Sequence, residues 1–297
     1  MNVLKLIKQN LCYIGKIWEK CMAVFISILT ALFIFCTWED MGVTQTFDKI
    51  KILMILCFIA LVWALLWACW LKREKEVWSR GLGKIVIRYG DLCKKAFCKR
   101  NKTERLFVIP VNTCFDTIVD EDIAAYNRPL VKPGSLHGQW IKGMEKAGKS
   151  KEMLNDAIKQ NLEGRGITPS NIISPDVKPR GNTKEYDIGT IAVVKGDHHS
   201  TFLLLALSRF DENNNAHATQ EDLIECMKKL IDFYDGNGQG YELFIPLMGT
   251  GSSRINISHK DSLRIITSML HLNCNQIQGK ANVIIYKGDK DKVTLND

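Results

Sequence analysis

Two long uncharged stretches constrain this 297-residue chain more than any other feature. Residues 21–38 read CMAVFISILTALFIFCTW and residues 52–71 read ILMILCFIALVWALLWACWL, without a charged side chain in 18 and 20 positions. Each is long enough to cross a hydrocarbon core of ~30 Å at a helical rise of ~1.5 Å per residue. Buried helices of a soluble core are the alternative, but they rarely lack charge on every face over this length. We therefore predict two transmembrane spans.

The distribution of Lys and Arg predicts how the spans are oriented. A signal peptide is excluded because no small-residue cleavage site follows the first span and a second span comes at once. About half of the net charge of +8 lies in residues 1–80, which we interpret as a topology signal and as attraction to anionic lipids, not as a nucleic-acid surface. The positive-inside rule then places both termini in the cytoplasm of an inner-membrane protein. The flanking basic residues are Lys5, Lys8, Lys16, Lys20, Lys72, Arg73, Lys75 and Arg80.

The cysteines and histidines do not form a recognisable metal or redox site. None of the ten cysteines forms a C-x-x-C pair, which is typical of reduced thiols in a cytoplasmic or membrane protein. His198 and His199 are adjacent, so on a turn their side chains point apart, and no partner set of cysteines or carboxylates is evident. We predict no metal, no catalytic thiol and no resident cofactor.

The remainder of the chain alternates strand and helix patterns. We assign residues 1–80 to the membrane unit, with 72–80 as a charged linker or helix extension, and residues 81–297 to one ligand-binding domain. Alternation of this kind predicts a three-layer α/β/α sandwich with a mixed, largely parallel sheet. Strands are expected at 84–88, 106–111, 190–194, 201–207, 242–246 and 281–286, and helices at 137–147, 151–162, 219–234 and 258–272.

Glycine and polar residues follow several of the predicted strands. The sequence PLMGTGSSRIN at 246–256 comes after a strand and before a helix, which is the setting of a phosphate cradle. It matches neither the G-x-x-x-x-G-K-[ST] loop nor G-x-G-x-x-G, so by itself it is weak evidence. Ligands of α/β proteins bind at the carboxyl ends of strands, where this loop and similar residues of other strands converge.

Four of these strand-end segments together resemble a macro domain, the α/β sandwich that binds ADP-ribose. They are Gly90-Asp91-Leu92, the strand Ile109–Asn112, the loop Gly134–Gly138 and the loop Pro246–Gly251. The resemblance covers roughly residues 81–290. With two spans in front, the chain looks like the membrane-anchored effectors of Thoeris anti-phage defence. In that family a separate TIR-domain enzyme makes an ADP-ribose-derived signal from NAD, and the effector binds it.

The resemblance implies contacts to the adenine and to the distal ribose. The carboxylate of Asp91, between Gly90 and the backbone of Leu92, would accept a hydrogen bond from the adenine amino group. Tyr286, at the end of the last strand, would stack on the base. Asn112 would face the distal ribose.

The resemblance also implies two phosphate cradles made of backbone N–H groups. The first is formed by residues 135–137 and the second by residues 249–253, where the lack of Cβ at Gly249 and Gly251 allows close approach. An arginine that is not part of the usual pattern could pair with a phosphate or with a carboxylate of a modified ligand. The residues concerned are Gly134, Ser135, Leu136, His137, Gly249, Thr250, Gly251, Ser252, Ser253 and Arg254.

Two departures from the family pattern indicate binding without hydrolysis. Phe115 stands where de-ADP-ribosylating macro domains usually have a second asparagine, and Pro133-Gly134-Ser135 replaces their triple glycine. We therefore expect a non-enzymatic effector. Its ligand would be an ADP-ribose derivative, for example an amino-acid conjugate such as histidine-ADP-ribose. Binding would drive self-association and membrane disruption, causing abortive infection. The alternatives are a membrane-tethered ADP-ribosyl hydrolase and a passive ADP-ribose-binding scaffold.

Overall fold

The structure is a computed structural model in which the chain forms two compact units. One contains the N-terminal helices, and the other runs from Glu74 to Asp289. The described residues are 11–35, 37, 38, 40, 42, 44–70, 74–100, 102–122, 125, 129–211, 215–251, 255–295 and 297.

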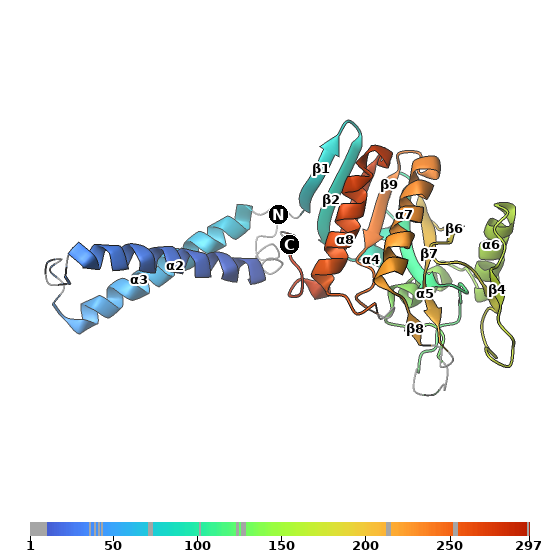
Figure 1. The fold of residues 1–297 in the computed structure, drawn as a ribbon, viewed down its shortest axis with the longest axis horizontal. Coiled ribbons are helices and arrows are strands. Elements are labelled where there is room, and N and C mark those ends of the chain that lie inside the picture. The colour runs from blue at the N-terminus through green and yellow to red at the C-terminus, as the bar shows by residue number, and fades with distance from the viewer. Residues whose placement is uncertain are drawn as a thin grey trace. The chain divides into compact units, whose positions relative to one another are not determined.

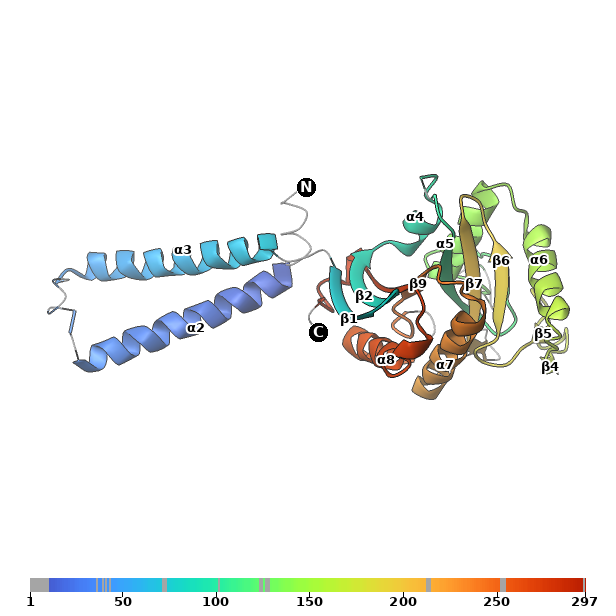
Figure 2. The same ribbon diagram turned by 90° about the horizontal axis from the view of Figure 1, so that it is seen from above.

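The N-terminal unit contains two helices of 25 residues each, α2 (Leu11–Phe35) and α3 (Thr46–Trp70) (Figure 2). They contact each other, and the indole N–H of Trp18 lies 3.5 Å from the carbonyl oxygen of Cys57. Large apolar side chains of α3 are exposed. Among the described residues, one stretch, Thr46–Leu66, is long and apolar enough to cross a membrane. The two spans at 21–38 and 52–71 stay a prediction, and each includes residues outside the described set.

The interpretation of residues 72–80 as a linker or helix extension is wrong. Strand β1 (Glu74–Arg80) forms there and pairs antiparallel with β2 (Gly83–Gly90). Exposed and half-buried side chains do not alternate regularly along β1, because its pairing with β2 shifts register between Glu76 and Trp78. A short edge strand with charged side chains lacks the apolar run of a central strand, which is why its sequence resembles a linker.

Eight strands form the main sheet, in the order β1-β2-β10-β9-β3-β7-β6, with β8 paired to β7. The five inner strands run parallel, and β1 and β6 are antiparallel to their neighbours, which confirms a mixed and largely parallel sheet. The remaining strands are β3 (Arg105–Asn112), β6 (Ile191–Lys195), β7 (Ser200–Phe210), β8 (Ala216–His217), β9 (Glu242–Pro246) and β10 (Lys280–Tyr286), with β4 (Asn171–Ile172) and β5 (Lys184–Glu185) in a separate pair.

Helices cover both faces of the sheet (Figures 1 and 2). On one face lie α7 (Gln220–Asn237) and α8 (His259–Leu272), which contact each other; on the other lie α4 (Leu92–Ala96) and α5 (Leu136–Lys146). Helix α6 (Lys151–Gly164) packs on β6. Short 3₁₀ helices, η2 (Cys274–Gln276) and η3 (Lys287–Asp289), flank β10.

Aromatic side chains fill the core between the sheet and α5. The rings of Phe107 and Phe244 stack with centroids 4.9 Å apart, and Trp140 meets Phe202 edge-on at 5.9 Å. His137, in the first turn of α5, stacks on Trp140 and is only 7% exposed. Burial lowers the pKa of His137 to about 3, although a hydrogen bond with the backbone of Asp116 acts in the opposite direction. The imidazole is therefore neutral at physiological pH.

Helix α6 closes the β6 edge of the sheet. The side-chain oxygen of Asn161 accepts the backbone N–H of Val193 at 2.8 Å, and the guanidinium of Arg165 donates to the carbonyl of Ile191 at 2.6 Å. Both backbone groups are thereby occupied, so another strand could pair at this position only by displacing the two side chains.

A buried ion pair fastens the segment that follows β3. The Lys178 ammonium donates to Asp116 Oδ2 and to the Asn182 carbonyl, both at 2.7 Å, and the Asn182 N–H donates to Asp116 Oδ1 at 2.7 Å. Lys178 is 3% exposed and Asp116 is fully buried. Asp120, four residues after Asp116, forms a second ion pair with Arg180. Because the loop around β4 and β5 carries both cations, it holds the β3–α5 connection in place.

Removing the Lys178 cation should destabilise the fold strongly. Lys178→Met leaves the Asp116 carboxylate buried without its partner, and such a change costs ~3–5 kcal/mol. The double variant Asp116→Asn/Lys178→Met should lose less stability, because it leaves no buried charge without a partner. Urea unfolding of the detergent-solubilised chain measures both. Lys142→Met, which breaks the exposed pair with Glu121, is the matched control and should cost ~1 kcal/mol or less. Equal losses for Lys178→Met and Lys142→Met would contradict this account.

His137 should make stability fall in acid. Its folded pKa, about 3, is below the ordinary value of 6.5. Between these two pH values the unfolded chain binds a proton that the folded chain does not, so stability decreases as pH falls through the window. His137→Asn should flatten that part of the profile when urea midpoints are compared at pH 7, 6 and 5. A variant profile as steep as the wild-type profile would exclude His137 as the cause.

Candidate functional site

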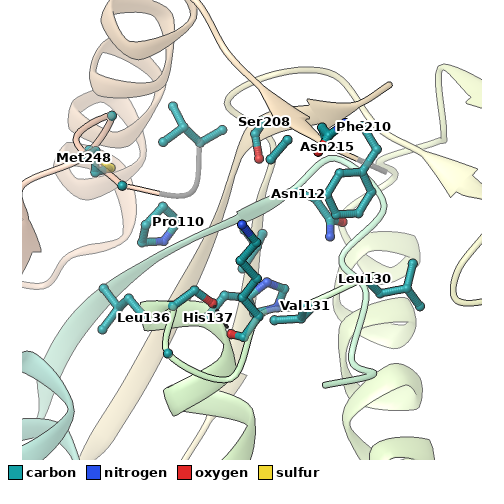
Figure 3. Close-up of a pocket in the computed structure, with 18 of the residues that line it drawn as sticks. Pro110, Asn112, Leu130, Val131, Leu136, His137, Ser208, Phe210, Asn215 and Met248 are labelled. Carbon is teal, nitrogen blue, oxygen red and sulfur yellow. Dashed lines mark hydrogen bonds between the residues drawn. The ribbon is translucent and has the colours of Figure 1, made fainter. Parts of the chain in front are cut away.

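A cavity of about 300 Å³ lies at the carboxyl ends of β9, β3 and β7. Its walls are the loop that enters α5, the loop that follows β9, the end of β3 and the β7–β8 turn region (Figure 3). This is the edge where ligands bind in open α/β sheets, and the volume falls at the low end of the range for small-molecule sites. Eight of the predicted site residues line it: Asn112, Gly134, Ser135, Leu136, His137, Gly249, Thr250 and Gly251.

The first loop is shaped by the N-terminus of α5. The Ser135 hydroxyl accepts the Gly138 N–H at 3.0 Å and donates to the Lys132 carbonyl at 2.7 Å. The Ser135 N–H also donates to Lys132, so it is already used within the loop. A Cβ on Gly138 would lie 2.2 Å from the Lys132 oxygen, which only glycine avoids. The N–H groups of Leu136 and His137 begin the helix and have no acceptor within it.

The second loop follows β9 and depends on Gly249. Its φ is +85°, and a Cβ there would lie 2.8 Å from Ile255 Cδ1. Ser262 on α8 donates its hydroxyl to the carbonyl of Met248 at 2.6 Å, which fixes the start of the loop. Thr250 and Gly251 continue the wall of the cavity. Ser252, Ser253 and Arg254 lie outside the described residues.

Asn112 lines the cavity, but its amide oxygen is occupied by the chain itself. Oδ1 accepts the N–H groups of Cys114 and Asp116, at 3.1 and 3.2 Å. The side chain therefore shapes the turn after β3, and that turn is the one held by the Asp116–Lys178 pair. A role towards a ribose stays a prediction.

Phe115 lies in the same turn and is packed in the core. It has a positive φ of 52°, is 1% exposed and meets Tyr186 edge-on at 5.6 Å between centroids. It does not line the cavity.

The predicted adenine contacts lie at the neighbouring strand ends and do not line this cavity. Tyr286 at the end of β10 is the register partner of Gly90 at the end of β2, and its ring is 55% exposed. Asp91 caps α4 by accepting the Lys94 N–H at 3.0 Å, and Leu92 is buried in the core. The structure thus brings these residues to the same edge of the sheet, beyond the described cavity.

Sequence reasoning missed the wall that the β7–β8 region contributes. Ser208, Phe210 and Asn215 line the cavity, and Figure 3 shows Phe210 and Asn215 on the opposite side of the view from Met248 and Leu136. Leu130 and Val131, before the first loop, were also missed. The apolar run gave no signal for this wall, because it ends at Leu207 as predicted, whereas strand β7 continues through Ser208 and Arg209 to Phe210.

The comparisons with known proteins agree with this architecture. A family model described as Thoeris protein ThsA, Macro domain, matches residues 85–286. The Thoeris protein ThsA of Bacillus amyloliquefaciens (strain Y2) is 25% identical over 225 residues, which cover 71% of this chain and 65% of that protein. The chain therefore spans less than two thirds of that relative's length.

Solved macrodomains are more distant. The Oceanobacillus iheyensis macrodomain with ADP has a TM-score of 0.45 and 11% identity, covering 75% of this chain and 95% of that one. The macrodomain of Mycobacterium tuberculosis DarG has a TM-score of 0.38 and 15% identity, covering 67% and 96%.

The family model spans well over half of the chain, from β2 to the end of β10, and so includes every strand that lines the cavity. The chain belongs to the macro-domain family of the Thoeris protein ThsA.

Proposed function

We propose that this chain is a ligand-gated membrane effector of anti-phage defence whose macro domain binds an ADP-ribose-derived nucleotide. The observation that supports the proposal is the cavity between two glycine-bearing loops at the carboxyl ends of parallel strands, in a chain of this family. The signal would come from a TIR-domain enzyme that consumes NAD. Histidine-ADP-ribose is one candidate for it.

The cavity has the chemistry that a diphosphate requires. The N-terminus of α5 offers the N–H groups of Leu136 and His137 together with the positive end of the helix dipole. Lys132, which lines the same wall, adds a cation. On the other side, Gly249 and Gly251 allow the backbone of the second loop to approach an anion closely.

We propose binding without turnover. Phe115 has no group that can move a proton, and its ring is buried against Tyr186. His137 is neutral, with its pKa lowered to about 3 by burial, so it is protonated only in strong acid. Neither residue is suited to act as a general acid near neutral pH. A bound nucleotide would therefore leave intact.

The output would be a change in self-association in the membrane. The exposed apolar surface of α3, which includes Phe47, Met54 and Phe58, suits contact with lipid or with other copies. A ligand that favours the associated state can shift the population from 1:99 to 99:1 with ~5.5 kcal/mol of differential affinity. Many copies would be required, because two helices cannot enclose a pore.

The first loop should control affinity. Gly138→Ala places a Cβ against the Lys132 carbonyl and must displace the loop, so the affinity for ADP-ribose should fall at least tenfold, equivalent to ~1.4 kcal/mol. Gly236→Ala in α7 is the matched control, because nothing lies within 4 Å of its added Cβ and it does not line the cavity. Calorimetric titration of the detergent-solubilised chain with ADP-ribose and histidine-ADP-ribose measures both. Equal affinity of the two variants for ADP-ribose would contradict the proposal that the first loop binds a phosphate.

Ligand should also change particle size. Saturating ligand should increase the mass measured by light scattering in detergent and release dye from liposomes that contain the chain, whereas Gly138→Ala should do neither. Chromatography of the ligand afterwards identifies its chemical state. Tight binding with unchanged mass would favour a passive scaffold, and release of a hydrolysed product would favour the membrane-tethered hydrolase.

A further inference from the structure

We infer that Phe210 and Asn215 form a subsite for the part of the ligand beyond its second phosphate, and that this subsite selects a ring that carries a hydrogen-bonding group. The inference rests on the proposed function and assigns a specificity role to a wall that no family motif marks. It depends on three observations: the order of the strand ends, the contacts of Phe210 and the hydrogen bonds of Asn215.

The order of strands across the sheet orders the parts of an extended ligand. From β2 the sequence is β10, β9, β3 and β7, all parallel, so their carboxyl ends follow one another along one edge. The second loop follows β9, Asn112 ends β3, and Phe210 ends β7. A ligand with its phosphates between the two loops therefore reaches Phe210 only through a group that extends past β3.

The ring of Phe210 is held by a buried cation. The Lys178 ammonium lies 5.7 Å from its centroid, within the range of a cation–π contact. Lys178 is in turn fixed by Asp116 and by the Asn182 carbonyl. Phe210 lines the cavity, so it offers an apolar, oriented surface for a ring of the ligand.

Asn215 supplies an acceptor beside that ring. Its backbone N–H and its Nδ2 both donate to the Asp211 carboxylate, at 2.7 and 3.1 Å. A carboxylate only accepts, so Nδ2 faces Asp211, and the amide keeps Oδ1 as an acceptor and its second N–H as a donor. Asn215 lines the cavity together with Phe210 and Ser208 (Figure 3). A group that binds beside Phe210 can therefore donate to Oδ1 or accept from the second N–H of Asn215.

Two sources carry this chemistry, the distal ribose itself and a ring attached to it. Titration of the full chain in detergent with ADP, ADP-ribose and NAD separates them, because ADP ends at the second phosphate, ADP-ribose adds the ribose and NAD adds nicotinamide. We expect ADP-ribose to bind more tightly than ADP. Phe210→Leu and Asn215→Ala should each lower ADP-ribose affinity roughly three- to tenfold and leave ADP affinity unchanged. A larger loss for NAD than for ADP-ribose would place the attached ring on Phe210.

Asn237→Ala is the matched control, because this exposed α7 residue also loses one side-chain hydrogen bond, to the Phe233 carbonyl, and does not line the cavity. This variant should bind ADP-ribose more tightly than ADP, to the same degree as the wild-type chain. Equal wild-type affinity for ADP and ADP-ribose would overturn the subsite, as would equal losses for both nucleotides in the two variants. If ADP, ADP-ribose and NAD all fail to bind, the proposed function is wrong, and the subsite is wrong with it.

Discussion

Parallel pairing of the five inner strands is the constraint on which the rest of the domain depends. Strands that run in one direction bring their carboxyl ends to one edge, and the chain must return through helices that cover both faces. The continuous apolar runs of β3 and β7 follow from this, since both faces of these strands are buried. The position of the cavity also follows from parallel pairing. Its lining comes from segments up to 141 residues apart in the sequence, from Pro110 to Gly251.

The walls of the cavity are fixed before any ligand arrives. Lys178 connects Asp116, which lies in the turn after β3, with Phe210 at the end of β7. Asn112 uses its amide to hold the same turn, and Ser262 holds the start of the second loop. A site with its loops already held loses less conformational entropy on binding than a mobile one, so more of the contact energy remains as affinity.

The sequence was sufficient to predict most of the fold. The apolar runs predicted the inner strands, and the capping residues Ser258 and Thr219 mark the starts of α8 and α7 where expected. The β1 strand was missed because an edge strand needs only one apolar face. Asp116 and Lys178 were missed because they are 62 residues apart, and no local pattern records such a pair. Asn215 was missed for a different reason, because its hydrogen bonds to Asp211 are local and no motif marks the turn that brings it to the cavity.

The closed β6 edge limits how copies of this domain can join. Asn161 and Arg165 occupy the Val193 N–H and the Ile191 carbonyl of β6, so a second sheet could extend the first at that side only by breaking both hydrogen bonds. Two domains joined through their β1 edges would present a closed edge at either end, and the sheet would stop growing at a pair. An open-ended filament requires a heterologous contact that repeats. An assembly larger than a pair would therefore use contacts of helices or loops, unless these two hydrogen bonds were broken.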